Sequence, residues 1–464
     1  MRHQWLLSLL LTLGGCMVGP HYEKPAAIVP ADYKEAPGWT RAVPADNEKK
    51  GEWWKVYHDP VLNGLEPSVS ISNQSLAADY AAYKQAQAIV REVRGGLFPT
   101  VGVTGSAIRS GNGGNVSSSQ NSGTFEGNAS WVPDIWGKIR RQVEGEEAAA
   151  QVSAAALANA TLSAQAALAS AYMNLRAQDA AITLLRQTVV AYQQSLDITE
   201  NRLQAGVAAP LDVITARTQL EVAQAQLINA GVARAQYEHA IAVLVGKPPA
   251  DLKLTPGQLI AEIPQVPVGM PSILLQRRPD IAAAERGMAQ ANAQIGVAVG
   301  AFYPDLTLSA LGGFSASPIN GLFSASNSLW SLGTSASGTL FDGGSRNAAV
   351  SAAKAGYEQS VATYRQTVLT AFQQVEDALS SLRILAEQAE TEKATVRDAE
   401  RGAQIALDEY QAGTQAYTTV VTAQVTLLSS RQAELAVQQN RLLASISLIQ
   451  AMGGGWKNTD IPKP

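Results

Sequence analysis

Four segments of the chain alternate apolar and polar residues, which is the pattern of a β-strand with one wet face. Two of them lie in the first half of the chain, at residues 100–108 and 124–131. The other two lie in the second half, one beginning at Leu306 and one at residues 330–340. Val, Leu, Ala, Phe and Trp occupy the apolar positions, and mostly Thr, Ser and Asn occupy the polar ones. The stretches are about ten residues long, which suits a tilted transmembrane strand. The pattern predicts two β-hairpins, either in a membrane barrel or half-buried in a soluble domain.

Each predicted hairpin has a polar loop and an aromatic border. The loops, over residues 109–123 and 315–328, are rich in Gly, Ser and Asn. No helix follows the GNGG sequence in the first loop, so it is not a phosphate cradle. Aromatic residues gather at the strand ends: Phe98, Trp131, Trp136, Phe302, Tyr303 and Phe341. This placement is typical of the aromatic girdle of a membrane barrel.

Each hairpin is followed by a very long helix, a tight turn and a second long helix. Residues 138–203 contain no proline and would extend about 100 Å, and residues 346–410 form a nearly equal stretch. Apolar residues recur at alternating spacings of three and four: Ile182, Leu185, Val189, Tyr192, Leu196 and Leu203, with a break at Thr199, and Val361, Tyr364, Val368, Ala371, Val375, Ala378, Leu382 and Leu385. This repeat predicts left-handed coiled-coil packing, although a plain solvent-exposed spacer would show it too. Gly206 and Pro210 predict the tip of a helical hairpin.

The chain is a tandem duplication of roughly 200 residues per copy. Three pairs of landmarks recur at a nearly constant offset: Pro99 and Pro304, Asp134 and Asp342, and Gly206 and Gly413. Each copy is expected to begin with a helix, over residues 76–93 and 281–299, and Ser72 and Asn73 are good caps for the first. Residues 248–271 contain six prolines and are predicted to connect the copies.

Four strands cannot close a barrel alone, and a chain that spans a bilayer by strands must form a closed barrel. After the leader, no segment reaches about 18 consecutive apolar residues, so a helical span is not expected. Two chains would give eight strands around a filled interior, whereas three would give twelve strands and a lumen. Small polar residues on the predicted inner face favour the trimer. A basic cluster after the second strand, Lys138, Arg140 and Arg141, is expected to be solvated or to meet lipid headgroups.

Composition and charge exclude several classes of protein. The 464 residues contain 35 Lys and Arg against 39 Asp and Glu, a formal net charge of −4, which excludes a basic nucleic-acid binder. Charged residues make up only 16% of the chain, against roughly a quarter in an ordinary soluble domain. No metal-ligand spacing of histidines, nucleophile elbow, Walker loop or HExxH sequence is present. We therefore expect no enzymatic activity, metal or soluble cofactor.

The N-terminus has the pattern of a lipoprotein signal peptide. A short basic start precedes an apolar stretch, residues 5–13, that is too short to span a bilayer. Leu13-Gly14-Gly15-Cys16 resembles the bacterial lipobox, in which cleavage leaves the cysteine as the first residue and it receives diacylglycerol and acyl chains such as palmitate. Met17 stands where an inner-membrane retention signal usually has Asp, so the resemblance indicates the outer membrane. A signal peptide cleaved elsewhere, with an incidental Cys16, is the alternative.

Taken together, these features resemble the outer-membrane factor family of tripartite efflux systems, the TolC/OprM-type proteins, and within it the NodT-like lipoprotein branch. The resemblance covers nearly the whole chain. Its specific pieces are Cys16 to Pro20 with Tyr22 and Pro25, Trp53-Trp54 leading to Asp59-Pro60, Arg277 to Ile281 continuing through Glu285 to Gly296, Tyr303-Pro304, and Gly453 to Trp456. Each piece is weak alone, but their order on a duplicated chain is specific.

The resemblance implies an α+β membrane protein that works as a homotrimer. Its twelve strands would form an outer-membrane barrel, and its twelve helices would form a periplasmic tunnel with an equatorial belt made by the terminal segments. A periplasmic adaptor and an inner-membrane pump, of RND type, would deliver the cargo. The tips of the helical hairpins would be closed at rest and would open when the adaptor docks.

The resemblance also places a periplasmic gate at the hairpin tips. The matching residues are Gly206, Leu211 and Asp212 on the first tip and Tyr410, Gly413, Gln415, Thr419 and Thr422 on the second. Family members often carry acids and an arginine on the second hairpin, but this chain has Thr422 and Val425 there, which puts a salt-bridge latch in doubt. Hydrogen bonds from Tyr410, Gln415 and Thr422, each worth about 1 kcal/mol, would have to hold the tips closed. Ordinary turn chemistry is the alternative for each tip residue.

The predicted organisation therefore has six parts: a signal peptide (1–15), a lipid-anchored segment and belt (16–71), repeat 1 (72–250), a Pro-rich linker (251–272), repeat 2 (273–452) and an equatorial tail (453–464). The predicted function is the exit duct of an efflux pump in the outer membrane of a Gram-negative bacterium, which passes drugs or other small molecules. The alternative is a lipid-anchored scaffold that spans the periplasm by its coiled coils without transport.

Overall fold

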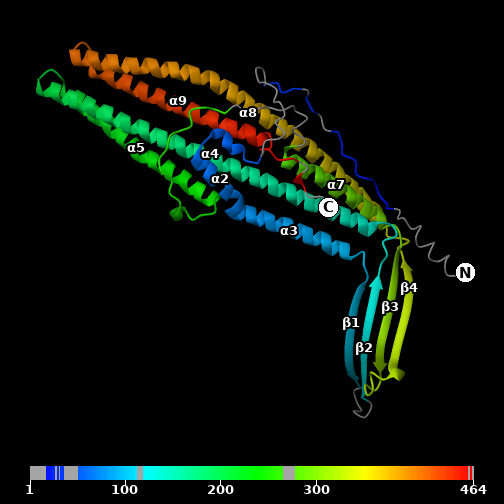
Figure 1. The fold of residues 1–464 in the computed structure, drawn as a ribbon. Helices are drawn as coiled ribbons and strands as arrows, with labels where there is room; N and C mark the ends of the chain where they lie inside the picture. The colour runs from blue at the N-terminus through cyan, green and yellow to red at the C-terminus, as the bar shows by residue number, and fades with distance from the viewer. Residues whose placement is uncertain are drawn as a thin grey trace.

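The chain forms an elongated layer of helices that ends in a four-stranded antiparallel sheet (Figure 1). The structure is a computed structural model. It describes residues 17–26, 29–30, 32–35, 51–111, 119–264, 277–457 and 460–461. Cys16 and the predicted signal peptide lie outside the described residues, as do parts of the predicted belt, first loop, linker and tail.

The same order of elements occurs twice along the chain. The first copy contains α3 (Gln74–Gly95), β1 (Thr100–Ser110), β2 (Gln120–Trp131), α4 (Lys138–Gln204) and α5 (Pro210–Leu244). The second contains α7 (Pro279–Gly300), β3 (Asp305–Ala316), β4 (Ser328–Ser337), α8 (Ser345–Ala412) and α9 (Tyr417–Ala451). Corresponding helices have 22 and 22, 67 and 68, and 35 and 35 residues, so the two copies share one architecture.

The helices lie side by side as rods of two kinds. α4 and α8 are continuous, whereas α5 and α3 are stacked end to end, and so are α9 and α7. At these junctions Asn73 Nδ2 donates to the Leu244 carbonyl at 2.9 Å, and Arg278 Nη1 donates to the Ala451 carbonyl at 3.0 Å. Contacts between elements give the order α5/α3, α4, α9/α7, α8. The α5/α3 rod and α8 are therefore the lateral edges of the layer.

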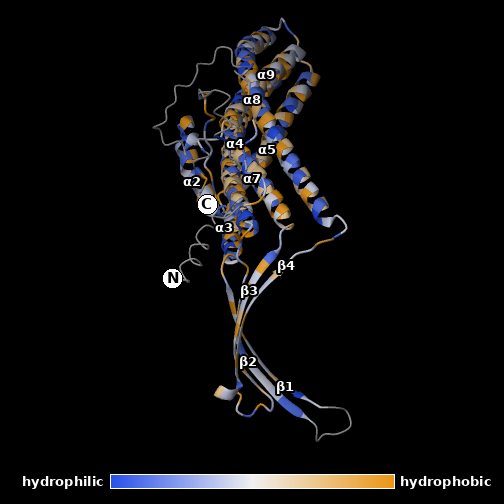
Figure 2. Cartoon of the chain, turned by 90° about the vertical axis from the view of Figure 1, so that its right-hand side faces the viewer, coloured by the Kyte–Doolittle hydropathy of each residue, from blue (hydrophilic) through white to orange (hydrophobic). Residues whose placement is uncertain are grey.

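The predicted heptad positions form the seams between these helices. Tyr364, Val368 and Val375 on α8 are almost fully buried, as are Tyr192 and Leu196 on α4. Thr199, where the heptad pattern breaks, is also fully buried. Its hydroxyl donates to the Ser195 carbonyl at 2.7 Å, so this polar residue stays in the seam without an unpaired group. Figure 2 shows the mixed hydropathy of the long helices, which matches packing on part of their surface.

The helix α4 contains one stretch that is long and apolar enough to cross a membrane, contrary to the sequence-based expectation. Its alanines raise the hydropathy without forming an unbroken apolar run. The helix packs against α3, α5, α7 and α9, and 33% of the apolar stretch is buried. Contacts with four neighbouring helices explain such an apolar stretch without a helical span.

Each strand of the sheet pairs with its neighbour in sequence, in the order β1-β2-β3-β4. The central β2–β3 pairing joins the two copies and sets Phe125 opposite Phe314. The strands β1, β2 and β3 are longer than the alternating pattern predicted, and each extends into a predicted loop. In contrast, β4 ends at Ser337, and Leu340, which was predicted to lie in this strand, is fully exposed beyond it.

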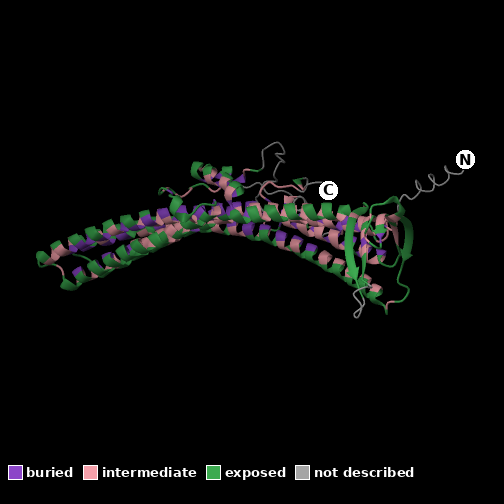
Figure 3. Ribbon diagram, turned by 90° about the horizontal axis from the view of Figure 1, so that it is seen from below, coloured by how far each residue is buried: buried purple, intermediate pink, exposed green. Residues whose placement is uncertain are grey.

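A belt of shorter segments lies on one side of the helical layer (Figure 3). We define it by residues 32–35, 51–73, 245–264 and 453–457. It includes η1 (Trp53–Tyr57), α2 (Pro60–Ser72) and η3 (Pro249–Asp251), and a further short turn, η4 (Ala325–Asn327), lies in the second strand loop.

The helix α2 was not predicted from the sequence. Asp59 begins it by accepting from the backbone N–H groups of Val61 and Leu62. Ser72 belongs to this helix, so Asn73 alone caps α3.

A buried polar network joins the belt to the helices. The Asp179 carboxylate accepts from Arg176 at 2.9 Å, from Arg234 at 2.7 Å and from the backbone N–H of Gly257 at 2.9 Å. Arg176 also donates to the Tyr172 hydroxyl, which donates to Asp59 at the start of α2. Because all these charges are paired and hydrogen-bonded, their burial is tolerated, and the network fixes the belt against α4 and α5.

Glu66 is the exception among the acids of the belt. It is fully buried on α2, and neither carboxylate oxygen has a hydrogen-bond partner among the described residues. Burial raises the pKa of Glu66 to about 9, so the carboxyl is neutral at physiological pH in the folded chain. In the unfolded chain it ionises near its ordinary value of 4.5. The unfolded state therefore binds fewer protons between these values, and stability falls as pH rises through this window.

We expect Glu66→Gln to remove this pH dependence and to stabilise the protein by about 2 kcal/mol near neutral pH. Thermal unfolding of the detergent-solubilised protein at about pH 5 and about pH 8 measures the effect, which should be larger at the higher pH. Glu92→Gln, at an exposed position of α3, is the control. Equal stabilisation at both pH values would contradict the assignment of a neutral buried carboxyl.

Candidate functional site

The two faces of the sheet differ in chemistry. The register places Val101, Ala129, Ala310 and Leu332 in one row across all four strands. The next such row on this face contains Val103 and Trp330. Rows on the other face carry Thr, Ser, Asn and Glu side chains, so the alternation predicted from the sequence gives one apolar and one polar face.

Most of the apolar face of the sheet is uncovered, although at its far end Phe323 packs on Phe125 and Phe314. Val101 is 79% exposed, Trp330 78% and Leu332 76%, although these are the residue types that normally fill a core. Within the described residues, β1 and β4 pair on one side each, so each leaves a row of backbone groups open. An apolar face and two open edges fit a fragment of a larger closed barrel whose outer face contacts lipid.

An aromatic cluster marks the junction between strands and helices. Trp136 stacks on Tyr303 with ring centroids 4.8 Å apart, and its indole N–H donates to the Pro304 carbonyl at 2.9 Å. Phe341 and Phe98 are strongly exposed at the same level. The predicted girdle therefore lies at the end of the barrel that faces the helices.

The first described residues of the chain are fixed at this junction. Val18 donates its backbone N–H to the Trp136 carbonyl at 3.1 Å. The guanidinium of Arg141 donates to the carbonyls of Val18, at 3.0 Å, and Gly19, at 3.2 Å. A Cβ at Gly19 would lie 2.5 Å from Gly296 Cα, so the segment passes too close to α7 for any other residue.

One residue of the predicted basic cluster, Arg141, has a different role from the one expected. Arg141 is fully buried and also pairs with Glu144, so it meets neither solvent nor lipid headgroups. Arg140 pairs with Asp134 at 3.2 Å. The sequence pattern gave no sign of this, because the partners of Arg141 are backbone carbonyls more than 100 residues away.

At the opposite end, the two hairpin tips have the predicted turn geometry. Gly206 and Gly413 have positive φ angles of 74° and 79°. After Gly206, the N–H of Val207 donates to the Arg202 carbonyl at 2.9 Å, which closes the helix end in a Schellman motif. Pro210 is the first residue of α5, as predicted.

The second tip is built around a buried aromatic pair. Tyr410 and Tyr417 are 3% and 2% exposed, with ring centroids 5.1 Å apart. The guanidinium of Arg202, from the first hairpin, lies 4.8 Å from the Tyr410 ring centroid and donates to the Gln411 carbonyl at 2.7 Å. Arg202 thus joins the two hairpins at their ends. A second link lies further in, where Gln424 donates to Ser195 at 2.7 Å.

The hydrogen bonds predicted to hold the tips do not join the two hairpins. Thr422 donates to the Thr418 carbonyl of its own helix, and Thr419 donates to the Gln415 side chain. The Tyr410 hydroxyl is buried without a hydrogen-bond partner among the described residues. Within one chain, the links between the hairpins come instead from Arg202 and from the Gln424–Ser195 hydrogen bond.

The remaining predicted gate residues lie on the first tip. Leu211 is 69% exposed. Asp212 lies in the first turn of α5, where a carboxylate is favourable for the helix. Burial raises the pKa of Tyr417 to about 12, and the nearby charge of Asp212 contributes to this rise. The charge of Asp212 thus acts on the aromatic pair.

Two tip residues, Arg202 and Tyr417, were not among the sequence-based candidates. Tyr417 is the first residue of α9. It follows Tyr410 by seven residues across the tip, and this spacing could have suggested that the two rings contact each other. Arg202 carried no such signal, since it lies outside the apolar heptad positions of its helix. The described residues contain no group of three or more His, Cys, Asp or Glu side chains that could hold a metal.

The sequence profile of the outer membrane efflux protein family matches residues 67–247 and 270–454, one segment in each copy. The chain belongs to this family. It is 32% identical to the toluene efflux pump outer membrane protein TtgC of Pseudomonas putida, over 97% of this chain and 96% of that protein. It is 28% identical to the cation efflux system protein CusC of Escherichia coli, over 96% and 97%.

Solved structures of family members have the same fold. The outer-membrane channel OprN is 30% identical, with a TM-score of 0.87 over 95% of this chain and all of that one. The open-state MtrE channel of Neisseria gonorrhoeae is 27% identical, with a TM-score of 0.83 over 96% and 99%. The predicted fold class, a trimeric α+β membrane channel built from a duplicated unit, is confirmed. The predicted function, an outer-membrane channel of an efflux system, is also confirmed, and the scaffold alternative is not supported.

We expect Arg202→Ala to loosen the tips, because it removes both the contact with Tyr410 and the hydrogen bond to Gln411. The loss of about 1–2 kcal/mol should raise the open-to-closed ratio roughly tenfold. Single-channel recording in planar bilayers measures this ratio. Arg186→Ala, at an exposed position of the same helix, should leave it unchanged. Indistinguishable behaviour of the two variants would show that Arg202 does not hold the gate.

Proposed function

We propose that this channel is a passive exit duct for drugs or other small molecules, supplied by an inner-membrane pump of RND type through a periplasmic adaptor. The observation that carries the proposal is the continuity of one apolar-and-polar sheet with two long helical hairpins in a single duplicated chain. The sheet supplies a passage through the membrane, and the hairpins extend it through the periplasm. The chain itself supplies no energy for transport.

Three chains complete the duct. Each chain has open edges at β1 and β4 of the sheet and at the α5/α3 rod and α8 of the helical layer. Pairing the opposite edges of successive chains is a head-to-tail contact, which closes into a ring. Twelve strands leave a lumen, whereas eight would be filled by side chains. The small polar residues of the inner face suit this lumen.

The adaptor would dock at the tips, where the first hairpin exposes apolar side chains. Val207, Leu211 and Ile214 are each more than 60% exposed within a few residues of the turn. Related channels serve pumps named for different cargo, toluene for TtgC and cations for CusC. Similarity to these channels therefore supports the route of export but selects no cargo.

The position of the N-terminal segment supports lipid attachment at Cys16. Met17 lies against Gly137, where a Cβ on the glycine would approach the Met17 side chain to 2.7 Å. Val18 is bonded to Trp136 in the aromatic border of the sheet. Met17 and Val18 are thus held at the end of the helical layer that meets the sheet. Diacylglycerol and acyl chains on Cys16 would insert into the periplasmic leaflet of the outer membrane, as the lipobox resemblance implies.

The purified trimer should show a small, rarely open conductance in planar bilayers, and Asp212→Ala should increase it by loosening the closed tips. Entry of vancomycin into cells that carry the variant should rise in parallel. Asp398→Ala, at an exposed position of α8 outside the tip, is a matched charge removal. Absence of conductance in every tip variant would refute the duct, whereas a response of all variants except Asp212→Ala would remove this residue from the gate.

For the anchor, we expect Cys16→Ser to abolish labelling of the protein by radioactive palmitate and to leave the barrel in place. The variant should still require detergent for extraction, because the apolar face of the sheet remains. Mass spectrometry of the N-terminal peptide of the wild type should show the attached acyl chains. An unmodified Cys16 in the wild type, or cleavage at another residue, would refute the anchor.

A further inference from the structure

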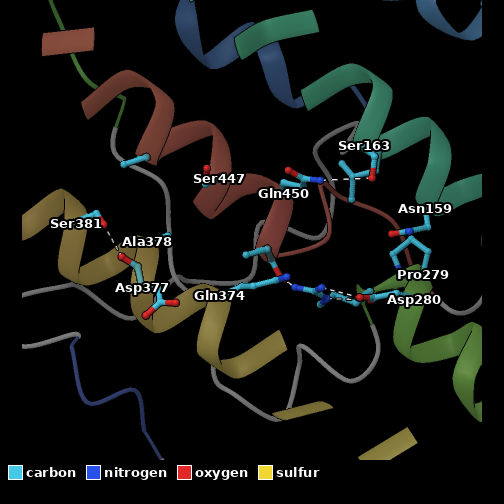
Figure 4. Close-up of a pocket in the computed structure, with 14 residues that line it drawn as sticks. Asn159, Ser163, Pro279, Asp280, Gln374, Asp377, Ala378, Ser381, Ser447 and Gln450 are labelled. Atoms are coloured by element: carbon cyan, nitrogen blue, oxygen red, sulfur yellow. Dashed lines mark hydrogen bonds and ion pairs between the residues drawn. The ribbon is translucent and has the colours of Figure 1, made fainter. Parts of the chain in front are cut away.

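A polar pocket of about 530 Å³ lies at the junction of α9 and α7, between α4 and α8 (Figure 4). It is lined from the four helices by side chains that include Ser163, Asp280, Gln374, Asp377, Ser447 and Gln450. The volume is in the range of sites that hold small molecules. No aromatic residue lines it, so it offers no stacking platform for a flat apolar molecule.

The pocket opens on the face of the helical layer opposite the belt. Residues two apart on a helix point in nearly opposite directions. On three helices, the pocket residue lies two positions from a residue that bonds to the belt. On α9, Ser445 bonds to Tyr57 of the belt and Ser447 lines the pocket. On α4, Gln165 bonds to Trp53 and Ser163 lines the pocket. On α8, Glu376 bonds to the backbone of Lys34 and Glu35, and Gln374 lines the pocket. The belt lies on the convex side of the layer (Figure 3), so the pocket is on the concave side.

Under the proposed function, the concave side is the wall of the tunnel, so the pocket faces passing cargo. A second hollow, of about 520 Å³, shares Asp280 and continues along α8, where it is lined by threonine and glutamine side chains. The two together form a polar track along the wall at the level of the belt.

The charges of the pocket leave one carboxylate uncompensated. Arg278 is 7% exposed and binds both oxygens of Asp280, at 3.0 and 2.6 Å. These two charges cancel. Asp377 is the remaining charged residue of the lining. Its carboxylate receives a 3.4 Å contact from Gln373 of its own helix, and Ser381 donates to its backbone carbonyl. The carboxylate is therefore available to a ligand, with amide and hydroxyl groups around it.

We propose that this pocket is a cargo-binding site in the tunnel wall for polar organic cations, whose ammonium group pairs with Asp377 while hydroxyl or amide groups of the ligand bond to Gln374, Gln450 and Ser447. The proposal rests on the proposed function for its orientation toward the tunnel. Each trimer would carry three copies of the site. Weak, repeated sites of this kind would favour entry of cationic cargo into the duct and still allow it to leave.

Isothermal titration of the full-length trimer in detergent tests the site, with kanamycin as the probe and trehalose as the neutral control. We expect saturable binding of kanamycin and none of trehalose. Asp377→Asn should weaken the binding of kanamycin about tenfold, because a charge-assisted hydrogen bond is lost. Ser447→Leu should weaken it too, by filling the pocket without a change of charge. Asp398→Asn, at an exposed position further along α8, should leave it unchanged.

Two results would overturn the proposal: no saturable binding to the wild type, or an equal effect of Asp377→Asn and Asp398→Asn, which would indicate non-specific attraction. Trimer stability of each variant, measured by thermal dissociation, identifies any folding defect. Conductance of the same preparations tests the duct independently of the binding site. A conducting wild type that does not bind kanamycin would refute the site alone, and a wild type that binds but never conducts would refute the duct alone.

Discussion

The open edges of the sheet are the constraint on which the rest of the molecule depends. A strand in a hydrocarbon layer cannot leave its amide and carbonyl groups unpaired, and each chain supplies four strands with two such edges. Closure must come from other chains. The helices meet across the same interface, because α5/α3 and α8 lie at the same two sides as β1 and β4 (Figure 1). A single interface therefore has to match both a sheet edge and a helix edge.

The duplication of the chain provides matching edges, because both copies have the same order of strands and helices. Two copies of one unit pair through β2 and β3 in the sheet, and through α4 with α7 and α9 in the helical layer. The contact between copies within a chain is then a template for the contact between chains. The copies differ where symmetry is not required: the first tip exposes apolar residues, whereas the second contains a buried tyrosine pair.

Local patterns were sufficient to predict the regular elements. Strand alternation and heptad spacing act between residues a few positions apart, and Gly206 and Pro210 set the first tip by their own backbone preferences. The elements that were missed depend on distant partners. α2 contains Gly64 and Pro67, which weaken a helix by propensity, and its place is set by Asp59 and the buried Tyr172. Arg141 and Arg202 likewise bind backbone carbonyls that no spacing rule connects to them.

The broken rods also determine how movement could pass along the molecule. Only α4 and α8 carry unbroken helical backbone from the tips to the sheet, while α5 and α9 end at the belt. A displacement of α9 reaches α7 through contacts such as the hydrogen bond between Ala451 and Arg278, not through a stiff helix. The junctions can therefore act as hinges, and the belt covers them on one side. A tip can be deflected on one half of its hairpin while the strands beyond the belt stay in register.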